Sequence, residues 1–196
     1  EPKGVCCSHQ NVLSTIESFQ KLAPLTKSDT FFAVTTFSFD IHVLELWWPI
    51  VVGAQLALAP DHVTCNGALM AAAIKLCKAT AFQATPFTYK FLTKAVADMK
   101  EPPGTLRLAL CGGEAFPPPL VPPILALVEK QQGKVYNCYG PTETTIWSSV
   151  YEVTKECEHW ERIPIGSPLP GEYFAFVSPD QDGLTGELKI GGSGTS

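Results

Sequence analysis

Short apolar runs recur along the chain at a spacing of about 25 residues and alternate with segments of helical periodicity. The apolar runs cover residues 31–36, 55–59, 81–85, 106–111 and 135–139. The helical segments cover residues 11–22, 41–52, 68–78, 88–99 and 123–132. Strands that alternate with helices in this way predict an α/β fold, because parallel neighbours need crossover connections. We therefore expect mostly parallel sheets wrapped by helices.

The pattern changes beyond residue 151, where the helical periodicity stops. Residues 173–178 and 186–190 indicate two antiparallel strands around a turn at 180–185. We expect them to begin a small β-rich subdomain, as a second layer or a small barrel. The sequence thus divides into an α/β core fragment at 1–150 and a β-rich segment of the same domain at 151–196. Both ends are turn-like and no Met begins the chain, so we expect a truncated piece of a larger domain.

A proline-rich stretch, PPPLVPP at residues 117–123, precedes the last helical segment. Proline is accommodated in the first turn of a helix but breaks the interior of one. We therefore expect this helix to begin near Pro122 or Pro123.

Composition and charge fit a packed domain and argue against nucleic-acid and membrane partners. The 196 residues are 45% hydrophobic, which is enough for a substantial core. The net charge of −5 argues against binding to nucleic-acid phosphates, which needs a clustered basic face. The longest apolar stretch, 41–60, is interrupted by His42, Glu45 and Gln55, which favours a buried helix followed by a strand over a membrane span.

The cysteines indicate free thiols in a reducing compartment. There are seven of them, an odd number, and no C-x-x-C spacing of a zinc or redox site occurs. The chain does not begin with a charged and then apolar signal segment. A cytoplasmic location is the simplest interpretation.

Asp40 stands in an otherwise apolar segment, directly after the first predicted strand. An unpaired carboxylate in such surroundings is destabilising, so it needs a partner. One interpretation is that Asp40 caps the helix that follows, which is the commonest role for Asp in that position. The other interpretation is that Asp40 binds the ammonium group of a ligand.

The segment NCYGPTETT, at 137–145, follows the last apolar run and combines groups that suit a nucleotide. In parallel sheets ligands bind beyond the carboxyl ends of the strands. Tyr139 can stack on a purine, backbone N–H and hydroxyl groups can face phosphate oxygens, and Glu143 can hold Mg²⁺. The alternative is an ordinary turn. The pair Gly112 and Gly113 after another strand is a weaker indication, because neither G-x-G-x-x-G nor a Walker lysine loop is present.

In combination and in order, these segments resemble the core motifs of adenylation domains in nonribosomal peptide synthetases. The resemblance runs essentially end to end and rests on PKGV with His9, the segments 37–48, 83–86, 110–115 and 137–145, RIPIGSP at 162–168 and GELKIGG at 186–192. The NCYGPTETT form is similar to the amino-acid-activating branch of the acyl-adenylate-forming superfamily. The resemblance implies the large N-terminal core of an adenylate-forming enzyme.

The reaction implied by this resemblance has two steps. A substrate carboxylate attacks the α-phosphate of MgATP to form an acyl adenylate and pyrophosphate, and a phosphopantetheine thiol on a carrier (thiolation) domain then takes the acyl group. Condensation domains of the parent synthetase are further partners. The resemblance gives Thr142 and Glu143 catalytic roles, with Thr142 on phosphate and Glu143 as the magnesium ligand. It implies a nucleotide site formed by Gly112, Gly113, Asn137, Tyr139, Gly140 and Thr142.

The same resemblance implies a substrate pocket for a small amino acid, and glycine is our specific expectation. Asp40 pairs with the α-ammonium group. The side chain faces Ile41, Leu44, Gln83, Leu110, Gly112, Cys138, Ile146 and Trp147, a set similar to that of glycine-activating domains. Such large apolar residues would also crowd out longer side chains by overlap. Cys138 is smaller than the aliphatic residue expected there, so alanine is partly tolerated; alternatively, Leu110 and Ile146 point into the core.

Several parts that the resemblance implies lie outside this sequence, and two alternative functions stay open. By resemblance, a phosphate loop precedes the chain, a ribose-binding aspartate follows it, and a mobile C-terminal subdomain carries a catalytic lysine. We therefore expect the isolated 196-residue chain to form no adenylate at a useful rate. The alternatives for the function are an acyl-CoA or aryl-CoA ligase, whose substrate has no ammonium group to pair with Asp40, and a catalytically silent fragment.

Overall fold

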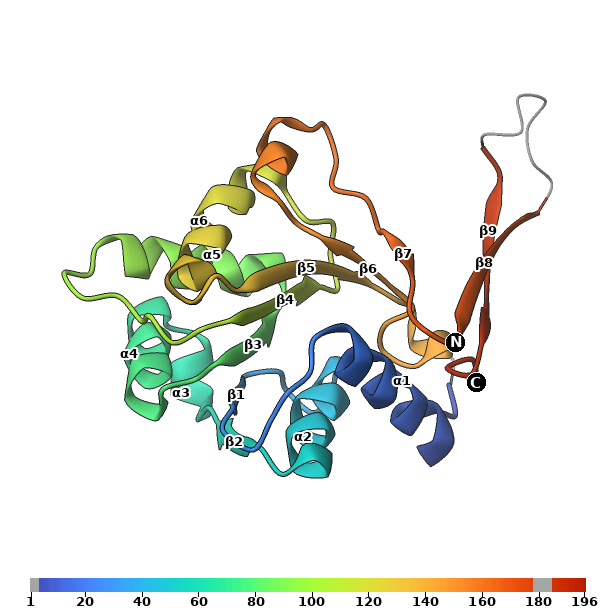
Figure 1. Cartoon of the computed structure of the whole chain (residues 1–196), viewed down its shortest axis with the longest axis horizontal. Coiled ribbons are helices and arrows are strands. Elements are labelled where there is room, and N and C mark those ends of the chain that lie inside the picture. The colour runs from blue at the N-terminus through green and yellow to red at the C-terminus, as the bar shows by residue number, and fades with distance from the viewer. Residues whose placement is uncertain (1–3, 178–184) are drawn as a thin grey trace.

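The computed structural model describes residues 4–177 and 185–196, and within them a seven-stranded sheet forms the centre of the molecule (Figure 1). Its order is β2-β1-β3-β4-β5-β6-β7. The first five strands are mutually parallel: β1 Thr30–Ala33, β2 Gln55–Leu58, β3 Ala81–Ala84, β4 Leu108–Gly112 and β5 Lys134–Tyr139. Strands β6 Ser149–Glu152 and β7 Ser167–Pro168 add to one edge in antiparallel pairing. The predicted α/β class is confirmed.

The helices follow the predicted segments closely. They are α1 His9–Leu22, α2 Ile41–Val52, α3 Asp61–Thr64, α4 Gly67–Cys77, α5 Pro86–Ala97 and α6 Val121–Val128. Four 3₁₀ turns add to them: η1 Pro118–Leu120, η2 Glu129–Gln131, η3 Thr142–Thr144 and η4 Lys155–His159. Helix α3 was not predicted, because one turn is too short for periodicity to show. Pro122 and Pro123 lie in the first turn of α6, as proline geometry requires.

Alternate residues of the strands pack against helices on opposite faces of the sheet. Phe31 belongs to a buried cluster that includes Phe19 of α1 and Trp48 of α2. Phe32 belongs to a second cluster with residues of α4, α5 and α6. This alternation is the two-residue period of a strand. The molecule is therefore a three-layer α/β/α arrangement with one core on each face.

Strands β8 Glu172–Val177 and β9 Glu187–Gly192 pair antiparallel and project from the main body (Figure 1). This confirms the two predicted strands. Residue 178 and positions 180–184 of the predicted turn lie outside the described residues. Residues 2 and 3 of the PKGV motif also lie outside them. Within the described part of the chain the pair is a ribbon and closes no barrel. Strand β6 spans the expected division at 150/151. The division of the domain into two segments stays a prediction.

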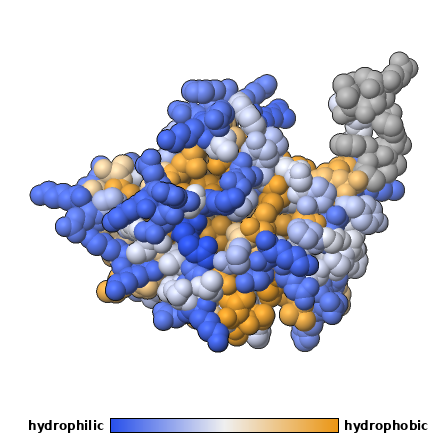
Figure 2. Space-filling model, viewed as in Figure 1, coloured by the Kyte–Doolittle hydropathy of each residue, from blue (hydrophilic) through white to orange (hydrophobic). Residues whose placement is uncertain are grey.

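Helix α2 is apolar on both its inner and its outer side. Leu44 and Trp48 are fully buried, whereas Trp47, Ile50 and Val51 are each more than half exposed. Figure 2 shows hydrophobic residues gathered on the surface at the lower edge of the view, where α2 lies in Figure 1. An exposed apolar surface of this kind is typical of a face covered by a protein neighbour.

The long apolar stretch and the cysteines are as the sequence predicted. Residues 41–60 form α2, a turn and β2, as predicted, and no helix in the described ranges is long and apolar enough to cross a membrane. All seven cysteines carry free thiols.

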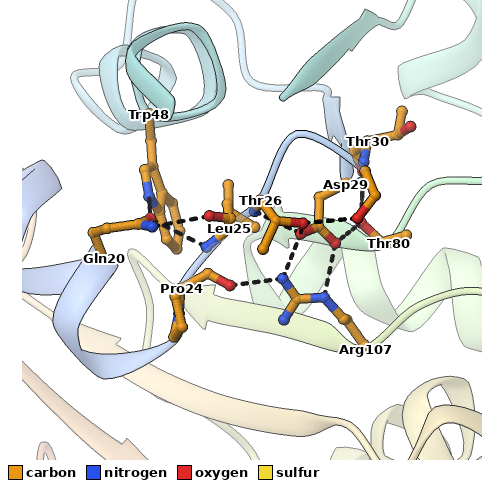
Figure 3. A network of polar contacts seen from close by, with 10 residues as sticks. Gln20, Pro24, Leu25, Thr26, Asp29, Thr30, Trp48, Thr80 and Arg107 are labelled. Atoms are coloured by element: carbon orange, nitrogen blue, oxygen red, sulfur yellow. Dashed lines mark hydrogen bonds and ion pairs between the residues drawn. The ribbon is translucent and has the colours of Figure 1, made fainter. Parts of the chain in front are cut away.

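The amino ends of the strands are joined by a polar network around Asp29, shown in Figure 3. Arg107, before β4, donates from Nε and Nη2 to the two Asp29 oxygens, each at 2.7 Å. Thr80, before β3, donates its hydroxyl to Oδ1 at 2.7 Å, and Thr26 donates its backbone N–H to Oδ2 at 2.7 Å. Burial alone would raise the pKa of Asp29, but the hydrogen bonds from Arg107, Thr80 and Thr26 hold it well below its usual range.

We expect Asp29→Asn to lower the free energy of unfolding by about 2–3 kcal/mol at pH 7, because it leaves Arg107 without its buried partner. The Asp29 side chain is 5% exposed and that of Arg107 is 34% exposed, which places this pair between the buried and surface cases. A folded pKa below the unfolded value means that the ionised carboxylate stabilises the fold above about pH 4. The difference between wild type and variant should therefore shrink as the pH falls further.

Urea unfolding followed by tryptophan fluorescence at several pH values measures this difference. Glu152→Gln, which breaks the exposed ion pair with Lys134, is the matched control and should change stability much less. Equal effects of the two substitutions would contradict the structural role of Asp29.

Candidate active site

The candidate site lies at the edge of the sheet where the parallel strands end. Because β1, β3, β4 and β5 are parallel, their carboxyl ends meet at one edge. The register places Gln83 of β3 beside Leu110 of β4, and Gly112 of β4 beside Cys138 of β5. Asp40 reaches this edge through the turn that joins β1 to α2. Four separate stretches of sequence thus meet at one place.

Asp40 occupies the N-cap position of α2, but it does not act as a cap. Its backbone is helical, with φ −59° and ψ −24°, and its side chain accepts no hydrogen bond from the first turn. Within residues 4–177 and 185–196 the carboxylate has no hydrogen-bond or ion-pair partner. The interpretation of Asp40 as a helix cap is therefore wrong, and its pairing with a ligand ammonium stays a prediction.

The indole of Trp147 is fixed by a hydrogen bond to Gln83. Nε1 of Trp147 donates to Oε1 of Gln83 at 2.9 Å, and Nε2 of Gln83 donates to the carbonyl oxygen of Ile41 at 3.0 Å. Trp147 and Gln83 are 2% and 0% exposed. Three of the residues predicted from sequence are thus linked in one buried network.

Gly112 and Gly113 leave space that neighbouring side chains fill. A Cβ atom at Gly112 would lie 2.5 Å from Cη2 of Trp147 and 2.4 Å from the carbonyl oxygen of Cys138, closer than real Cβ atoms come. Gly113 has a φ of +85°, and a Cβ atom there would lie 3.3 Å from Cδ1 of Ile41. The double glycine therefore lets the indole and the Ile41 side chain approach the end of β4.

The apolar residues of the expected pocket belong to one buried cluster, on the face of the sheet that α1 and α2 cover. They are Ile41, Leu44, Leu110, Cys138, Ile146 and Trp147. Leu110 and Ile146 are 0% and 2% exposed, so both are core residues of the cluster that contains the Trp147 indole. Burial raises the pKa of the Cys138 thiol well above its ordinary value.

A pocket of about 400 Å³ opens at the ends of β4 and β5 beside this cluster. Six of the predicted residues line it: Gly113, Asn137, Cys138, Tyr139, Gly140 and Trp147. The Tyr139 side chain is accessible at the mouth of the pocket, with 38% of the residue exposed.

Nδ2 of Asn137 donates to the carbonyl oxygen of Pro164 at 2.7 Å. Asn137 thereby connects the 163–165 loop to β5. Ile163 and Ile165 of that loop also line the pocket, as do residues 114–116.

Thr142 and Glu143 lie in η3, exposed and directly after β5. The backbone N–H and the hydroxyl of Ser196 each donate to the carbonyl oxygen of Glu143 at 2.9 Å. Its carboxylate has no partner among the described residues, and these contain no group of three or more metal-ligating side chains. A single free carboxylate fits Mg²⁺, which prefers oxygen ligands and commonly shares them with substrate phosphates. Glu143 therefore fits the predicted magnesium role.

The residues that follow η3 have an unusual backbone. Thr145 and Ile146 have φ values of +55° and +74°, the left-handed region that β-branched residues rarely adopt. The carbonyl oxygen of Thr145 accepts a hydrogen bond from the Thr15 hydroxyl at 3.2 Å. The Thr145 hydroxyl donates to the Gly194 carbonyl oxygen at 2.7 Å. Contacts with α1 and with the C-terminal segment therefore hold this turn, and the turn aims Trp147 back at β4.

Sequence reasoning missed Glu45, which is fully buried beside Gln83. Burial raises the pKa of the Glu45 carboxyl, while hydrogen bonds from Thr35, Gln83 and Val34 act in the opposite direction. A signal was present: Glu45 lies four residues after Ile41 in an apolar helix and so shares its inner face. In the sequence alone, Glu45 is one of the polar residues that interrupt the apolar stretch 41–60.

The comparisons with known proteins agree with this geometry. The sequence model described as "AMP-binding enzyme" matches residues 1–196, and the chain belongs to that family. Tyrocidine synthase 3 of Brevibacillus parabrevis is 35% identical over 98% of this chain and 3% of its own length. A dimodular nonribosomal peptide synthase of Bacillus subtilis is 34% identical over 98% of this chain and 8% of its own length. The chain thus spans a small part of these relatives.

Solved structures narrow the class further. A holo four-domain nonribosomal peptide synthetase bound to AMP and glycine matches with a TM-score of 0.84 and 33% identity, over 99% of this chain and 14% of that chain. The Vibrio cholerae adenylation domain AlmE, in complex with glycyl-adenosine-5'-phosphate, matches with a TM-score of 0.80 and 25% identity, over 96% of this chain and 34% of that chain. Within its family, the chain is similar in fold and sequence to the adenylation domains of nonribosomal peptide synthetases.

Proposed function

We propose that the parent protein activates glycine, and alanine less well, as an aminoacyl adenylate with MgATP. One observation carries the choice of substrate: Asp40, whose carboxylate has no partner among the described residues, directly precedes Ile41, and the Ile41 carbonyl is linked through Gln83 to the fixed Trp147 indole. The carboxylate would bind the α-ammonium group of the amino acid. The indole and the aliphatic cluster would exclude side chains longer than a methyl group. Two of the similar solved structures contain glycine or its adenylate, which supports the same substrate.

The nucleotide would lie against the ends of β4 and β5, in the pocket of about 400 Å³. Tyr139 would pack on adenine, because its ring is accessible at the pocket mouth. Gly112, Gly113, Asn137 and Gly140 would line the nucleotide site. The hydroxyl of Thr142 is exposed after the strand and would contact phosphate.

In the first step, a carboxylate oxygen of the amino acid attacks the α-phosphorus and pyrophosphate leaves. Asp40 and the pocket walls would hold the amino acid so that this oxygen faces the phosphorus, which removes much of the entropic barrier. Glu143 and phosphate oxygens would hold Mg²⁺, which when bound neutralises charge on the phosphates. In the second step, the phosphopantetheine thiol of a carrier domain would take the aminoacyl group and AMP would leave. Carrier and condensation domains of the parent are the expected partners.

Amino-acid-dependent exchange of pyrophosphate into ATP by the full parent protein tests this function. We expect exchange with glycine and none without an amino acid. Exchange that depends on a fatty or aryl acid, which has no ammonium group for Asp40, would identify an acyl-CoA or aryl-CoA ligase instead. No exchange with any acid would reject activation altogether.

Glu143→Ala in the parent should raise the magnesium concentration needed for half-maximal exchange and lower the maximal rate by about 10²-fold, as for loss of one charge-stabilising group. Exchange rates across a magnesium titration measure both effects. Glu129→Ala is a matched control, because Glu129 is an exposed carboxylate in η2, before the amino end of β5. A normal magnesium response in Glu143→Ala would remove this residue from the metal site.

A further inference from the structure

Glu45 is a charged side chain in the middle of the buried network beside the pocket, and it is 0% exposed. Oε2 accepts the backbone N–H groups of Val34 and Thr35 at 2.9 and 3.0 Å. Oε1 accepts the hydroxyl of Thr35 at 2.6 Å and Nε2 of Gln83 at 3.2 Å. Each oxygen thus has two donors, as expected of a carboxylate that only accepts. The side chain is held rigidly between the end of β1 and Gln83.

The contacts of Gln83 leave only one orientation for its amide. The Glu45 carboxylate and the Ile41 carbonyl are both acceptors, so both require the NH₂ end of the amide. The oxygen end then faces Trp147, whose indole N–H can only donate. If the amide were reversed, its NH₂ group would face the indole N–H, and two buried donors would meet without an acceptor.

We propose that Glu45 is a specificity-positioning residue, whose carboxylate sets the orientation of the Gln83 amide and through it holds the Trp147 indole beside Gly112. The indole fills the space where a side chain at position 112 would lie, with Cη2 2.5 Å from a Cβ atom built there. Displacement of the indole therefore enlarges the pocket. Glu45 touches neither substrate nor nucleotide in this account, and the inference rests on the proposed selection of a small amino acid.

Glu45→Gln tests this directly: glutamine has the same shape, the backbone N–H groups of Val34 and Thr35 require its oxygen on their side, and its NH₂ group then faces Gln83. In the full parent protein we expect the ratio of kcat/KM for glycine to that for alanine to fall by about tenfold, and the KM for ATP to stay unchanged. A loss of activity that is equal for glycine and alanine would show a merely structural role and overturn the proposal.

The same substitution in a Trp147→Phe background separates a positioning role from other effects. Phenylalanine keeps an aromatic ring but has no N–H group. The orientation of the Gln83 amide then no longer determines where the aromatic ring lies. We expect Glu45→Gln to change the glycine-to-alanine ratio only when Trp147 is present, a strong non-additivity. The same change in both backgrounds would overturn the proposal. Asp29→Asn is the matched control, because it removes another buried carboxylate at the opposite end of the strands and should leave the ratio unchanged.

Thr35→Val is a second variant in case Glu45→Gln does not fold. It removes the 2.6 Å hydrogen bond to Oε1, the oxygen that contacts Gln83, and leaves the charge in place. We expect a smaller loss of glycine preference that again disappears in the Trp147→Phe background, and an unchanged preference would count against Glu45. If the unmodified parent activates no amino acid, the proposed function is wrong. If the parent prefers glycine and these variants do not alter that preference, only the proposed role of Glu45 is wrong.

Discussion

Asp40→Ala in the parent protein should raise the KM for glycine by about two to four orders of magnitude and leave the KM for ATP nearly unchanged. The substitution would leave the ammonium group of the bound amino acid without a counter-ion, at a cost of about 3–5 kcal/mol by analogy with buried ion pairs. The structure makes this effect separable from helix stability, because the Asp40 side chain makes no hydrogen bond to the first turn of α2.

Pyrophosphate exchange at varied glycine and varied ATP measures the two constants. Asp98→Ala is a suitable control, because Asp98 is an exposed carboxylate at the C-terminal end of α5. An unchanged KM for glycine in Asp40→Ala would show that Asp40 does not bind the substrate.

Trp147→Ala should convert the glycine preference into a preference for larger side chains. It removes the indole that fills the space beside Gly112, and one methyl group forced into a packed pocket costs about 1–3 kcal/mol, which is tenfold or more in preference. We therefore expect kcat/KM for alanine to exceed that for glycine in this variant, while binding of the ammonium group by Asp40 is retained.

The measurement is exchange with glycine, alanine, valine and leucine, expressed as ratios so that a partial loss of folded protein cancels. Trp160→Ala is the matched control, because Trp160 is partly exposed and contacts Tyr151 outside the buried cluster. A retained preference for glycine over alanine in Trp147→Ala would mean that the indole is not the wall of the pocket.

Most of the fold could be predicted from the sequence, because the apolar runs and helical periodicity carry a strong signal. Helix α2 was predicted with the same bounds, and α6 was located by its prolines. Strands β6 and β7 were missed, because β7 has only two residues and the β6 sequence, SVYE, is neither a continuous apolar run nor a clean alternation of apolar and polar residues. The ribbon of β8 and β9 was found from its turn residues, but not the way in which it projects from the body.

The site was predicted in part, and the missing part has a physical reason. The resemblance located Gln83, Gly112 and Trp147, but their mutual arrangement depends on contacts between residues as distant as Gln83 and Trp147. Glu45 was overlooked because a single charge in an apolar helix does not reveal its partners. The same limit applied to Asp40, for which sequence allowed a helix cap as readily as a ligand contact, and the cap interpretation was wrong.

The most direct test of the account is the identity of the acyl group that the parent protein loads onto its carrier domain. The full protein in its phosphopantetheine-bearing form is given ATP, Mg²⁺ and an equimolar mixture of the proteinogenic amino acids, and the thioester is identified by mass spectrometry. We predict a glycyl thioester with a minor alanyl component, because in the proposed site Asp40 would select an ammonium group and the Trp147 indole would exclude longer side chains. An aromatic or charged aminoacyl group on the carrier, or an acyl group without an ammonium, would contradict the account.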